Sequence, residues 1–508
     1  MNNSEQTKML QHWFLVLLAA CEVVVCLPAT GQGNTVETAE TWNVIAEKEI
    51  RRAESYVPLK HRAKNVILFL GDGMGISTVT AARILKGGEE SLLFFESFPN
   101  TALSKTYCAD HQVTDSAASA TAFQCGVKTN KGLLGLDPRV TRDNCNASRQ
   151  DGMILTSILD WSLEQGKSVG LVTTTRITHA TPAGAYANVA DRDWEGDSVL
   201  PEQADKDGCR DIARQLVEDY PDVQVIMGGG RQFFLPANGT DPNTNTTNSN
   251  AGRRDFRDLT QEWQDQQQDK KRKAAYVWNA QQLKSLDLNN TDYLFGLFAQ
   301  SHMDYDANRN PEVQPSLAEM TSAAIKILSK NPNGFYLLVE GGRIDHSHHD
   351  NVAYFALHDT VAFSDAIEAA SNLTCDEETL TVTTADHSHT MIIAGYQSRG
   401  TPIFNVADDR LDTDGNQFST LLYGTGPGYR YNQTRRVNLT SQQTNARTYV
   451  QESSVPMDSS SHAGEDVAIY AKGPMAHLFH AVHEENYIAH AMAYASCVGR
   501  YKASGTCP

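Results

Sequence analysis

Short apolar segments recur along this chain, and each ends in glycines or a polar cluster before helical sequence begins. They lie at residues 66–70, 169–173, 223–227, 335–339 and 380–383. Their length and β-rich composition are typical of buried strands. Strands that alternate with helices predict an α/β fold, in which a mostly parallel central sheet carries helices on both faces.

Four other segments have a distinct character. Residues 41–56 have apolar side chains at near-helical spacing and predict an amphipathic helix. Residues 238–250 have almost no apolar content and predict an exposed loop, and residues 261–273 predict a polar surface addition anchored by Trp263. Residues 396–460 are turn-rich and polar, which predicts a small, crown-like lobe inserted in the main domain.

The N-terminus has the pattern of a signal peptide. Lys8 precedes an apolar run over 13–27, and the small residues Ala29 and Gly31 follow. We expect a signal peptide over 1–30 and a mature domain over 31–508. The alternative is a signal anchor, although the run is short for a membrane span. No other stretch approaches membrane length, so we expect a secreted chain without a membrane span.

Cysteines and glycosylation motifs agree with a secretory route. Seven cysteines lie outside the leader; Cys497 and Cys507 bracket a Gly-containing loop and could pair. The odd number leaves at least one free thiol or an intermolecular bond. The Asn-x-Ser/Thr motifs outside the leader predict a glycoprotein and begin at Asn146, Asn238, Asn245, Asn289, Asn372, Asn432 and Asn438.

The charge balance excludes one class of partner. The formal net charge is −18 and the pI is about 5.3, whereas nucleic-acid binders normally carry a basic face. Anionic substrates are not excluded, because a local metal cluster can override the global field.

Acidic and imidazole side chains collect directly after the predicted strands. Ligands of open α/β sheets bind beyond the carboxyl ends of the strands, so these residues should meet at one edge. Carboxylates gathered there would repel one another without cations, which predicts a metal site. The candidates are Asp72, His179, Thr181, Glu340, Asp345, His346, His348, His349, Asp386 and His387.

Spacing alone does not choose the ligands within the His-rich segment. Asp345 and His349 are four residues apart and share one face of a helix, but His346 and His349, three apart, could do the same. Imidazole with carboxylate suits zinc, and an all-oxygen set suits magnesium. The alternative is a solvated His-rich turn, which the additional Asp and His clusters at strand ends disfavour.

A third motif concerns phosphate. Thr114, Asp115 and Ser116 precede an Ala-rich helical segment, and the free N–H groups at a helix start favour phosphate. The alternative is a simple N-cap. The Gly-Asp-Gly-Met-Gly segment that begins at Gly71 is no dinucleotide fingerprint, because its glycine spacing is wrong and an acid lies among the glycines. That acid would repel phosphate unless a cation intervened.

Taken in order, these motifs resemble the alkaline phosphatase family, and its animal branch in particular. The matching segments include NVILFLGDGMG, VTDSAASATAFQCGVKTN, GFYLLVEGGRIDHSHHD, TVTTADHSH and SSHAGEDVAIYAKGP. The resemblance implies a hydrolase of small phosphate monoesters with Ser116 as the nucleophile, through a phosphoserine intermediate, and with Arg192 binding the phosphate. It also implies a homodimer that the helix around Trp42 stabilises.

The resemblance further implies two zinc ions and one magnesium. One zinc would bind Asp345, His349 and His462, and the second Asp72, Asp386 and His387, with the Ser116 oxygen as a further ligand. Magnesium would bind Asp72, Thr181 and Glu340, with His179 acting through water. The implied disulfides are Cys145–Cys209 and Cys497–Cys507. Mammalian relatives carry a further calcium site, where this chain has Asn243, Ala299 and Gln314 in place of acids, so we expect it to be absent or weak.

Two other functions compete with this interpretation. A phosphodiesterase or sulfatase of the same superfamily would usually lack the third metal, which Thr181, Glu340 and Arg192 argue against. A catalytically silent zinc-binding protein would be expected to have lost Ser116 or Arg192, and both are present. The chain ends at Cys507-Pro508 without an apolar tail, so we expect secretion rather than a lipid anchor.

Overall fold

The computed structural model describes residues 37–248, 252–409, 411–430 and 438–508. Two compact units result, Met1–Ser55 and Tyr56–Pro508. The expected signal peptide lies outside the described residues. Within the described ranges, no helix is both long enough and apolar enough to cross a membrane.

The first unit contains the predicted amphipathic helix, α2 (Ala39–Ser55). None of its residues is buried, and Trp42, Ile45 and Ile50 are about half exposed. The helix therefore forms as the apolar spacing predicts, but its apolar side chains remain largely uncovered.

The second unit is built on a ten-stranded sheet with the strand order β15-β2-β14-β8-β1-β7-β3-β4-β6-β5. Every strand runs parallel to its neighbours except β14, so the predicted mostly parallel α/β fold is confirmed. The strands are β1 (Asn65–Gly71), β2 (Asn100–Lys105), β3 (Ser168–Arg176), β4 (Val225–Gly229), β5 (Ala274–Val277), β6 (Tyr293–Leu297), β7 (Phe335–Gly341), β8 (Thr379–Thr384), β14 (Val467–Lys472) and β15 (Ala481–Glu484).

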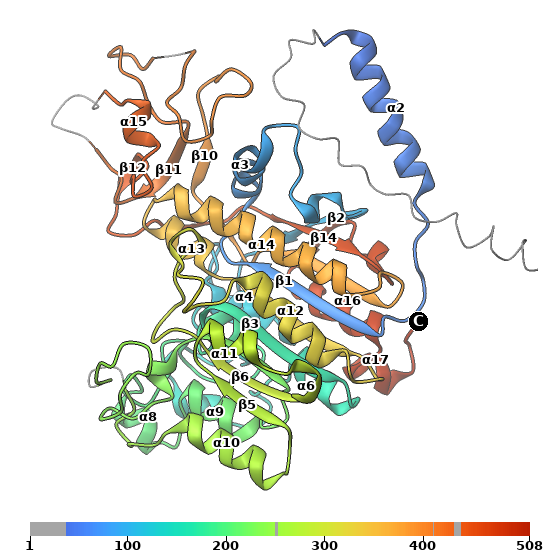
Figure 1. Ribbon diagram of the computed structural model, residues 1–508, viewed down its shortest axis with the longest axis vertical. Helices are drawn as coiled ribbons and strands as arrows, with labels where there is room; N and C mark the ends of the chain where they lie inside the picture. Colours follow the sequence, from blue (N-terminus) through green and yellow to red (C-terminus); the bar gives the residue numbers. More distant parts are fainter. Residues whose placement is uncertain (1–36, 249–251, 410, 431–437) are drawn as a thin grey trace, which may run out of the picture. The chain divides into compact units, whose positions relative to one another are not determined.

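Helices cover both faces of this sheet because successive strand residues point to opposite sides. Ile67 and Phe69 of β1 join the core cluster under α3 (Ile76–Gly87), α12 (Leu317–Leu328) and α14 (Ala353–Leu373). Figure 1 shows α12 and α14 lying across the sheet. Leu68 and Leu70 join the opposite cluster, which α4 (Ser116–Cys125), α6 (Ile158–Glu164), α9 (Ile212–Asp219), α10 (Leu259–Asp269) and α16 (Tyr487–Ser496) cover.

The remaining α-helices are short. They are α5 (Cys145–Ser148), α7 (Ala180–Ala183), α8 (Glu202–Lys206), α11 (Ala280–Ser285), α13 (Arg343–His349), α15 (Ser441–Thr444) and α17 (Gly499–Ser504). α13 follows β7 directly and carries the His-rich segment, so it is the short helix that matters most for the site.

A second, three-stranded sheet lies partly in the turn-rich region over 396–460, with two of its strands inside these bounds and one before them. It contains β10 (Met391–Ile393), β11 (Leu421–Gly426) and β12 (Ser453–Pro456), with β10 antiparallel and β12 parallel to β11. Figure 1 shows this sheet together with α15.

The segment expected to be an exposed loop, residues 238–250, is only partly so. Asp241 and Asn248 are buried, and Asp241 forms a buried ion pair with Arg231 at 2.9 Å. A buried guanidinium needs a counter-charge, which the composition of the segment did not reveal. Trp263 of α10 is buried, as the predicted anchor requires.

Among the described residues, two disulfides are present, Cys145–Cys209 and Cys497–Cys507, as the resemblance implied. Among the described cysteines, Cys108 and Cys125 are free and buried, and Cys375 is free and exposed.

Candidate active site

The predicted strand-end residues meet at the carboxyl edge of the central strands. Asp72 follows β1, Glu340 lies near the end of β7, and Asp386 follows β8. These strands are neighbours in register, because Leu70 pairs with both Glu340 and Thr384. The parallel order therefore places acids that are distant in sequence beside one another.

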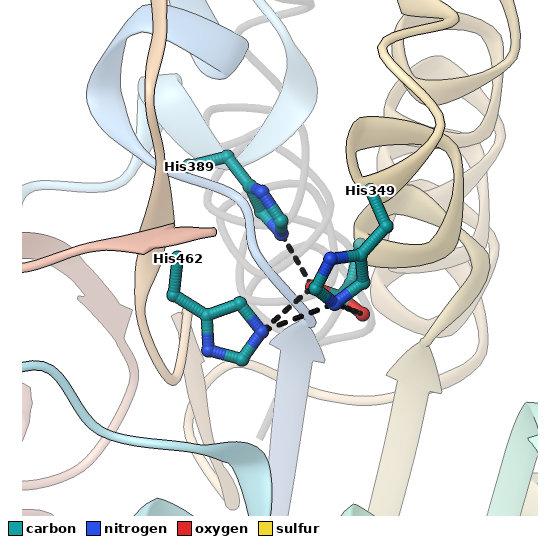
Figure 2. A group of neighbouring side chains, drawn as sticks. His349, His389 and His462 are labelled. Atoms are coloured by element: carbon teal, nitrogen blue, oxygen red, sulfur yellow. Dashed lines mark hydrogen bonds and ion pairs between the residues drawn. The ribbon is translucent and has the colours of Figure 1, made fainter. Parts of the chain in front are cut away.

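The first group of candidate metal ligands surrounds Asp345, and Figure 2 shows the three imidazoles that face it. Asp345 and His349 lie four apart on α13, with His349 Nε2 at 3.3 Å from Asp345 Oδ2. His462 Nε2 lies 3.5 Å from Asp345 Oδ1. His389 Nε2 contacts the same oxygen at 2.5 Å.

The pairing of two short strands brings His462 and His389 into this group. β13 (His462–Ala463) pairs antiparallel with β9 (Ser388–His389), and His462 is the partner of His389. His389 was not among the predicted ligands. The available signal was its position two residues after His387, which a strand would keep on the same side.

The geometry also separates His349 from His346, a choice that spacing left open. His346 Nδ1 lies 2.9 Å from Arg343 Nη1, and its ring packs against those of His179 and His302. His346 is therefore outside the group around Asp345, whereas His349 belongs to it.

The second group contains Asp72, Asp386 and His387, all buried. His387 Nε2 lies 3.1 Å from Asp386 Oδ2 and 3.6 Å from Asp72 Oδ1. The third group contains Asp72, His179 and Glu340. Asp72 thus belongs to two groups, which makes the groups adjoin.

Glu340 is held by hydroxyl groups of the neighbouring strand β3. Thr173 Oγ1 donates a hydrogen bond to Glu340 Oε2, and Thr175 Oγ1 donates another at 3.0 Å. Thr181, in α7, is buried, and its carbonyl accepts a hydrogen bond from Gln124 Nε2 at 2.7 Å. The oxygen-rich surroundings of Glu340 resemble the ligand sets that magnesium prefers.

The buried carboxylates of these groups are not balanced by the protein alone. Asp72 Oδ2 and Glu340 Oε1 have no hydrogen-bond partner among the described residues. Burial raises the pKa of Glu340 to about 7. Burial and the neighbouring carboxylate Asp386 raise the pKa of Asp72 well above its usual value. Bound cations would contact the unpartnered oxygens and would stabilise the ionised carboxylates, so these side chains fit metal ions.

Ser116 is the first residue of α4 and lies between these groups. Its Oγ is 3.3 Å from His387 Nε2 and 3.5 Å from Asp72 Oδ1. Asp115 is the N-cap, accepting from the Ala118 N–H at 3.3 Å. Asp115 is therefore the N-cap, as one interpretation of the motif predicted, while the Ser116 hydroxyl lies beside the candidate metal ligands.

Arg192 faces the same space from the loop after α7. Its Nη1 donates to Asp115 Oδ2 at 3.0 Å, and its Nη2 lies 3.1 Å from His179 Nε2. Burial alone would lower the pKa of Arg192, but Asp115 outweighs it, so the guanidinium stays charged. The guanidinium contacts Asp115, the residue directly before Ser116, and could bind an anion there.

Two of the positions implied for calcium, Asn243 and Gln314, form side-chain hydrogen bonds within the protein. Asn243 Nδ2 donates to the Trp278 carbonyl at 3.1 Å. Gln314 Oε1 accepts from the Asp304 N–H at 2.8 Å. Asp241, an acid in the same segment as Asn243, is paired with Arg231.

Carboxylates this deeply buried require cations to balance them, so fold and side chains together define a class: an α/β metalloenzyme. The comparisons narrow that class. Residues 63–498 match the family model for alkaline phosphatase. An alkaline phosphatase from Gadus morhua is 50% identical over 90% of this chain and 97% of its own length. The tissue-nonspecific isozyme from Homo sapiens is 50% identical over 96% of this chain and 93% of its own length.

The chain belongs to the alkaline phosphatase family, and its similarity to fish, bird and mammalian members places it in the animal branch. It is an enzyme that hydrolyses phosphate monoesters. Solved structures agree on the fold: the alkaline phosphatase of the Antarctic bacterium TAB5 superposes with a TM-score of 0.59 at 22% identity, covering 87% of this chain and 100% of that one. The Thermus thermophilus enzyme gives a TM-score of 0.60 at 23% identity, covering 87% and 93%.

Proposed function

We propose that this phosphatase acts through Ser116 as a covalent nucleophile and Arg192 as the phosphate-binding cation. The observation that carries the proposal is the position of Ser116 Oγ, within 3.5 Å of both Asp72 Oδ1 and His387 Nε2 at the start of α4. A hydroxyl in this position has donor groups of two metal sites beside it and helix N–H groups behind it.

In this proposal, Asp345, His349 and His462 hold one zinc, and Asp72, Asp386 and His387 hold the other. Asp72, Thr181 and Glu340 hold magnesium, with His179 acting through water. When bound, these ions supply Lewis acidity that activates the serine hydroxyl and water and neutralises developing negative charge. His389 positions Asp345 by its contact with Oδ1.

The reaction then needs two displacements at phosphorus. In the first displacement, Ser116 Oγ attacks phosphorus and the P–O bond to the alcohol breaks. The serine hydroxyl loses its proton, the departing alkoxide gains a proton, and the products are phosphoserine and the free alcohol. Water then attacks the phosphoserine, which restores the Ser116 hydroxyl and releases inorganic phosphate. Arg192 contributes a planar fork of donors that suits two phosphate oxygens. Because these contacts involve only the phosphoryl group, the alcohol has little influence on selection.

We further propose how the chain is processed and assembled. Residues 1–30 act as a signal peptide, and the mature chain is a secreted, glycosylated homodimer that α2 stabilises. Residues 396–460 form a crown-like insertion in the domain over 31–508. The two disulfides and the exposed apolar residues of α2 support this proposal.

Two variants on the same helix test the catalytic proposal. Ser116→Ala should reduce hydrolysis of p-nitrophenyl phosphate by several orders of magnitude while zinc content and fold are retained. Ser119→Ala is the matched control, because Ser119 is also buried on α4 but donates only to the Asp115 carbonyl, at 3.1 Å. Equal activity of Ser116→Ala and Ser119→Ala would refute the role of Ser116.

A further inference from the structure

The loop between β2 and α4 contains a fourth group of potential metal ligands, and it does not belong to the active site. Within the described part of the chain, Cys108, Asp110 and His111 each offer one ligand atom within 4.8 Å of the other two. Asp110 Oδ1 lies 3.3 Å from Cys108 Sγ and 3.0 Å from His111 Nδ1. Tetrahedral zinc with bonds of about 2.0–2.3 Å separates its ligand atoms by roughly 3.3–3.8 Å, so these contacts would lengthen by less than about 1 Å on binding.

The group has an enclosed side and an open side. Cys108 is buried, whereas the side chains of His111 and Asp110 are 52% and 40% exposed. An ion bound by these three residues would contact the buried sulfur on one side and leave a coordination position facing solvent on the other. Cys108 has no disulfide partner, so its sulfur remains available.

The backbone holds these side chains together before any ion arrives. The Cys108 N–H donates to the His111 carbonyl at 3.1 Å, and the Ala109 N–H donates to the Thr129 carbonyl at 2.9 Å. The Lys131 N–H donates to Asp110 Oδ1 at 2.9 Å. A loop tied at both ends in this way loses less conformational entropy when it binds an ion.

The ligand types select the class of ion. One sulfur, one imidazole and one carboxylate suit zinc or a similar borderline metal, whereas calcium and magnesium prefer oxygen alone. Burial raises the pKa of the Cys108 thiol, so binding must displace its proton. Affinity for the ion should therefore increase with pH.

We propose that Cys108, Asp110 and His111 form a peripheral binding site for a zinc-class divalent ion, and that the bound ion weakens phosphate binding at the active site. The route to the active site is short. Asp110 accepts from the Lys131 N–H, and the adjacent Gly132 N–H donates to Asp115 Oδ1 at 3.0 Å.

The same turn also holds the arginine of the active site. The Gly132 carbonyl accepts from the Arg192 N–H at 2.9 Å, and Asp115 binds the Arg192 guanidinium. An ion bound by Asp110 Oδ1 would compete with the Lys131 N–H for that oxygen, which would shift this turn and loosen the placement of Arg192. This coupling rests on the proposed role of Arg192, whereas ion binding itself does not.

Cobalt provides the test of binding, because thiolate-to-cobalt absorption requires sulfur and the active-site groups contain none. Protein carrying Cys375→Ser, which removes the exposed free thiol, is loaded with zinc and magnesium, dialysed until only the active-site ions remain, and titrated with Co²⁺. We expect the thiolate band to saturate at one equivalent per chain. Cys108→Ser in this background should abolish the band, and His111→Gln should weaken binding. Absence of the band, or its persistence in Cys108→Ser, would overturn the site.

Inhibition by inorganic phosphate tests the coupling separately. Added zinc should raise the inhibition constant for phosphate by about fivefold in the Cys375→Ser protein, which is the lower end of usual coupling between sites. The Cys108→Ser, Cys375→Ser double variant should show no such increase. An equal zinc effect in both proteins, or none in either, would overturn the modulation even where the cobalt band is present.

Discussion

At the scale of single residues, Arg192 shows how the protein prepares for an anion. Its guanidinium is held by Asp115 and by His179, at 3.0 Å and 3.1 Å, so it is oriented before phosphate binds. Asp115 in turn is fixed as the N-cap of α4 and by the Gly132 N–H. Preorganisation of this kind reduces the cost of ordering a long side chain on binding.

Arg192→Lys should therefore weaken phosphate binding although the charge is kept. A lysine cannot donate two parallel hydrogen bonds, and we expect the inhibition constant for phosphate to rise by about tenfold, or ~1.4 kcal/mol. Competitive inhibition assays measure this constant. An unchanged value in Arg192→Lys would argue against a two-donor contact.

His349 and His346 offer a matched pair on α13. His349→Ala removes an imidazole that faces Asp345, so we expect the loss of about one zinc per chain. His346→Ala removes the imidazole beside Arg343 and should leave zinc content unchanged. Elemental analysis after dialysis distinguishes the two, and equal zinc content in both variants would contradict the ligand assignment.

At the scale of elements, much of the site is formed by strands and helices that follow one another directly in the sequence, and this succession can be predicted from the sequence. The helix α13 follows the strand β7 after Gly342 alone. The four-residue spacing of Asp345 and His349 allows their contact, although spacing did not exclude a pair formed by His346 and His349. His389 could not be found in this way. Its position depends on the pairing of β9 with β13, two-residue strands separated by more than seventy residues and too short to leave a periodic signal.

The prediction that residues 238–250 are exposed was only partly correct, for a related reason. Composition indicated solvent exposure, but Arg231 is buried and requires this acid, a long-range demand that local composition does not record. The order of strands in the sheet could likewise not be predicted, because the pattern of apolar segments does not indicate which strands are neighbours.

The same segment carries a prediction about calcium. Since Asn243 donates its amide hydrogens to the Trp278 carbonyl, a cation would face a donor there rather than an acceptor. We expect millimolar calcium to leave the melting temperature of the zinc- and magnesium-loaded protein unchanged. A calcium-dependent rise of several degrees, with magnesium as the control ion, would contradict this.

At the scale of the whole molecule, the metal groups link stability to pH. In the metal-free fold, burial raises the pKa of Glu340 to about 7. Burial alone would lower the pKa of His349, but Asp345 raises it to about 9. Both groups hold protons that the unfolded chain releases at lower pH. The stability that Glu340 contributes is therefore lost between about pH 4.5 and 7, and that of His349 between about pH 6.5 and 9. His387 and His462, whose pKa burial lowers to about 4, act in the opposite direction only below about pH 6.5.

Metal-stripped protein should therefore melt at a lower temperature at about pH 9 than at about pH 6.5. Zinc- and magnesium-loaded protein should not show this decrease, because bound cations favour ionised carboxylates and neutral imidazoles. Differential scanning calorimetry of both forms measures the effect. A metal-stripped protein whose melting temperature rises across this interval would show that other groups dominate.

The association state is a second property of the whole molecule. If α2 stabilises a homodimer, its apolar residues Trp42, Ile45 and Ile50 become covered on assembly. Light scattering should give twice the chain mass, and removal of residues 37–55 should shift the mass towards that of one chain. Full activity from a single chain at micromolar concentration would contradict the dimer.

Direct identification of the covalent intermediate tests the mechanism most sharply. The enzyme is mixed with excess p-nitrophenyl phosphate, quenched in acid and digested, and the phosphate is located by mass spectrometry. We expect phosphate on Ser116 in the wild-type protein, and none in Ser116→Ala. Phosphate on another residue, or full turnover without any phosphorylated peptide, would contradict a mechanism that begins at Ser116.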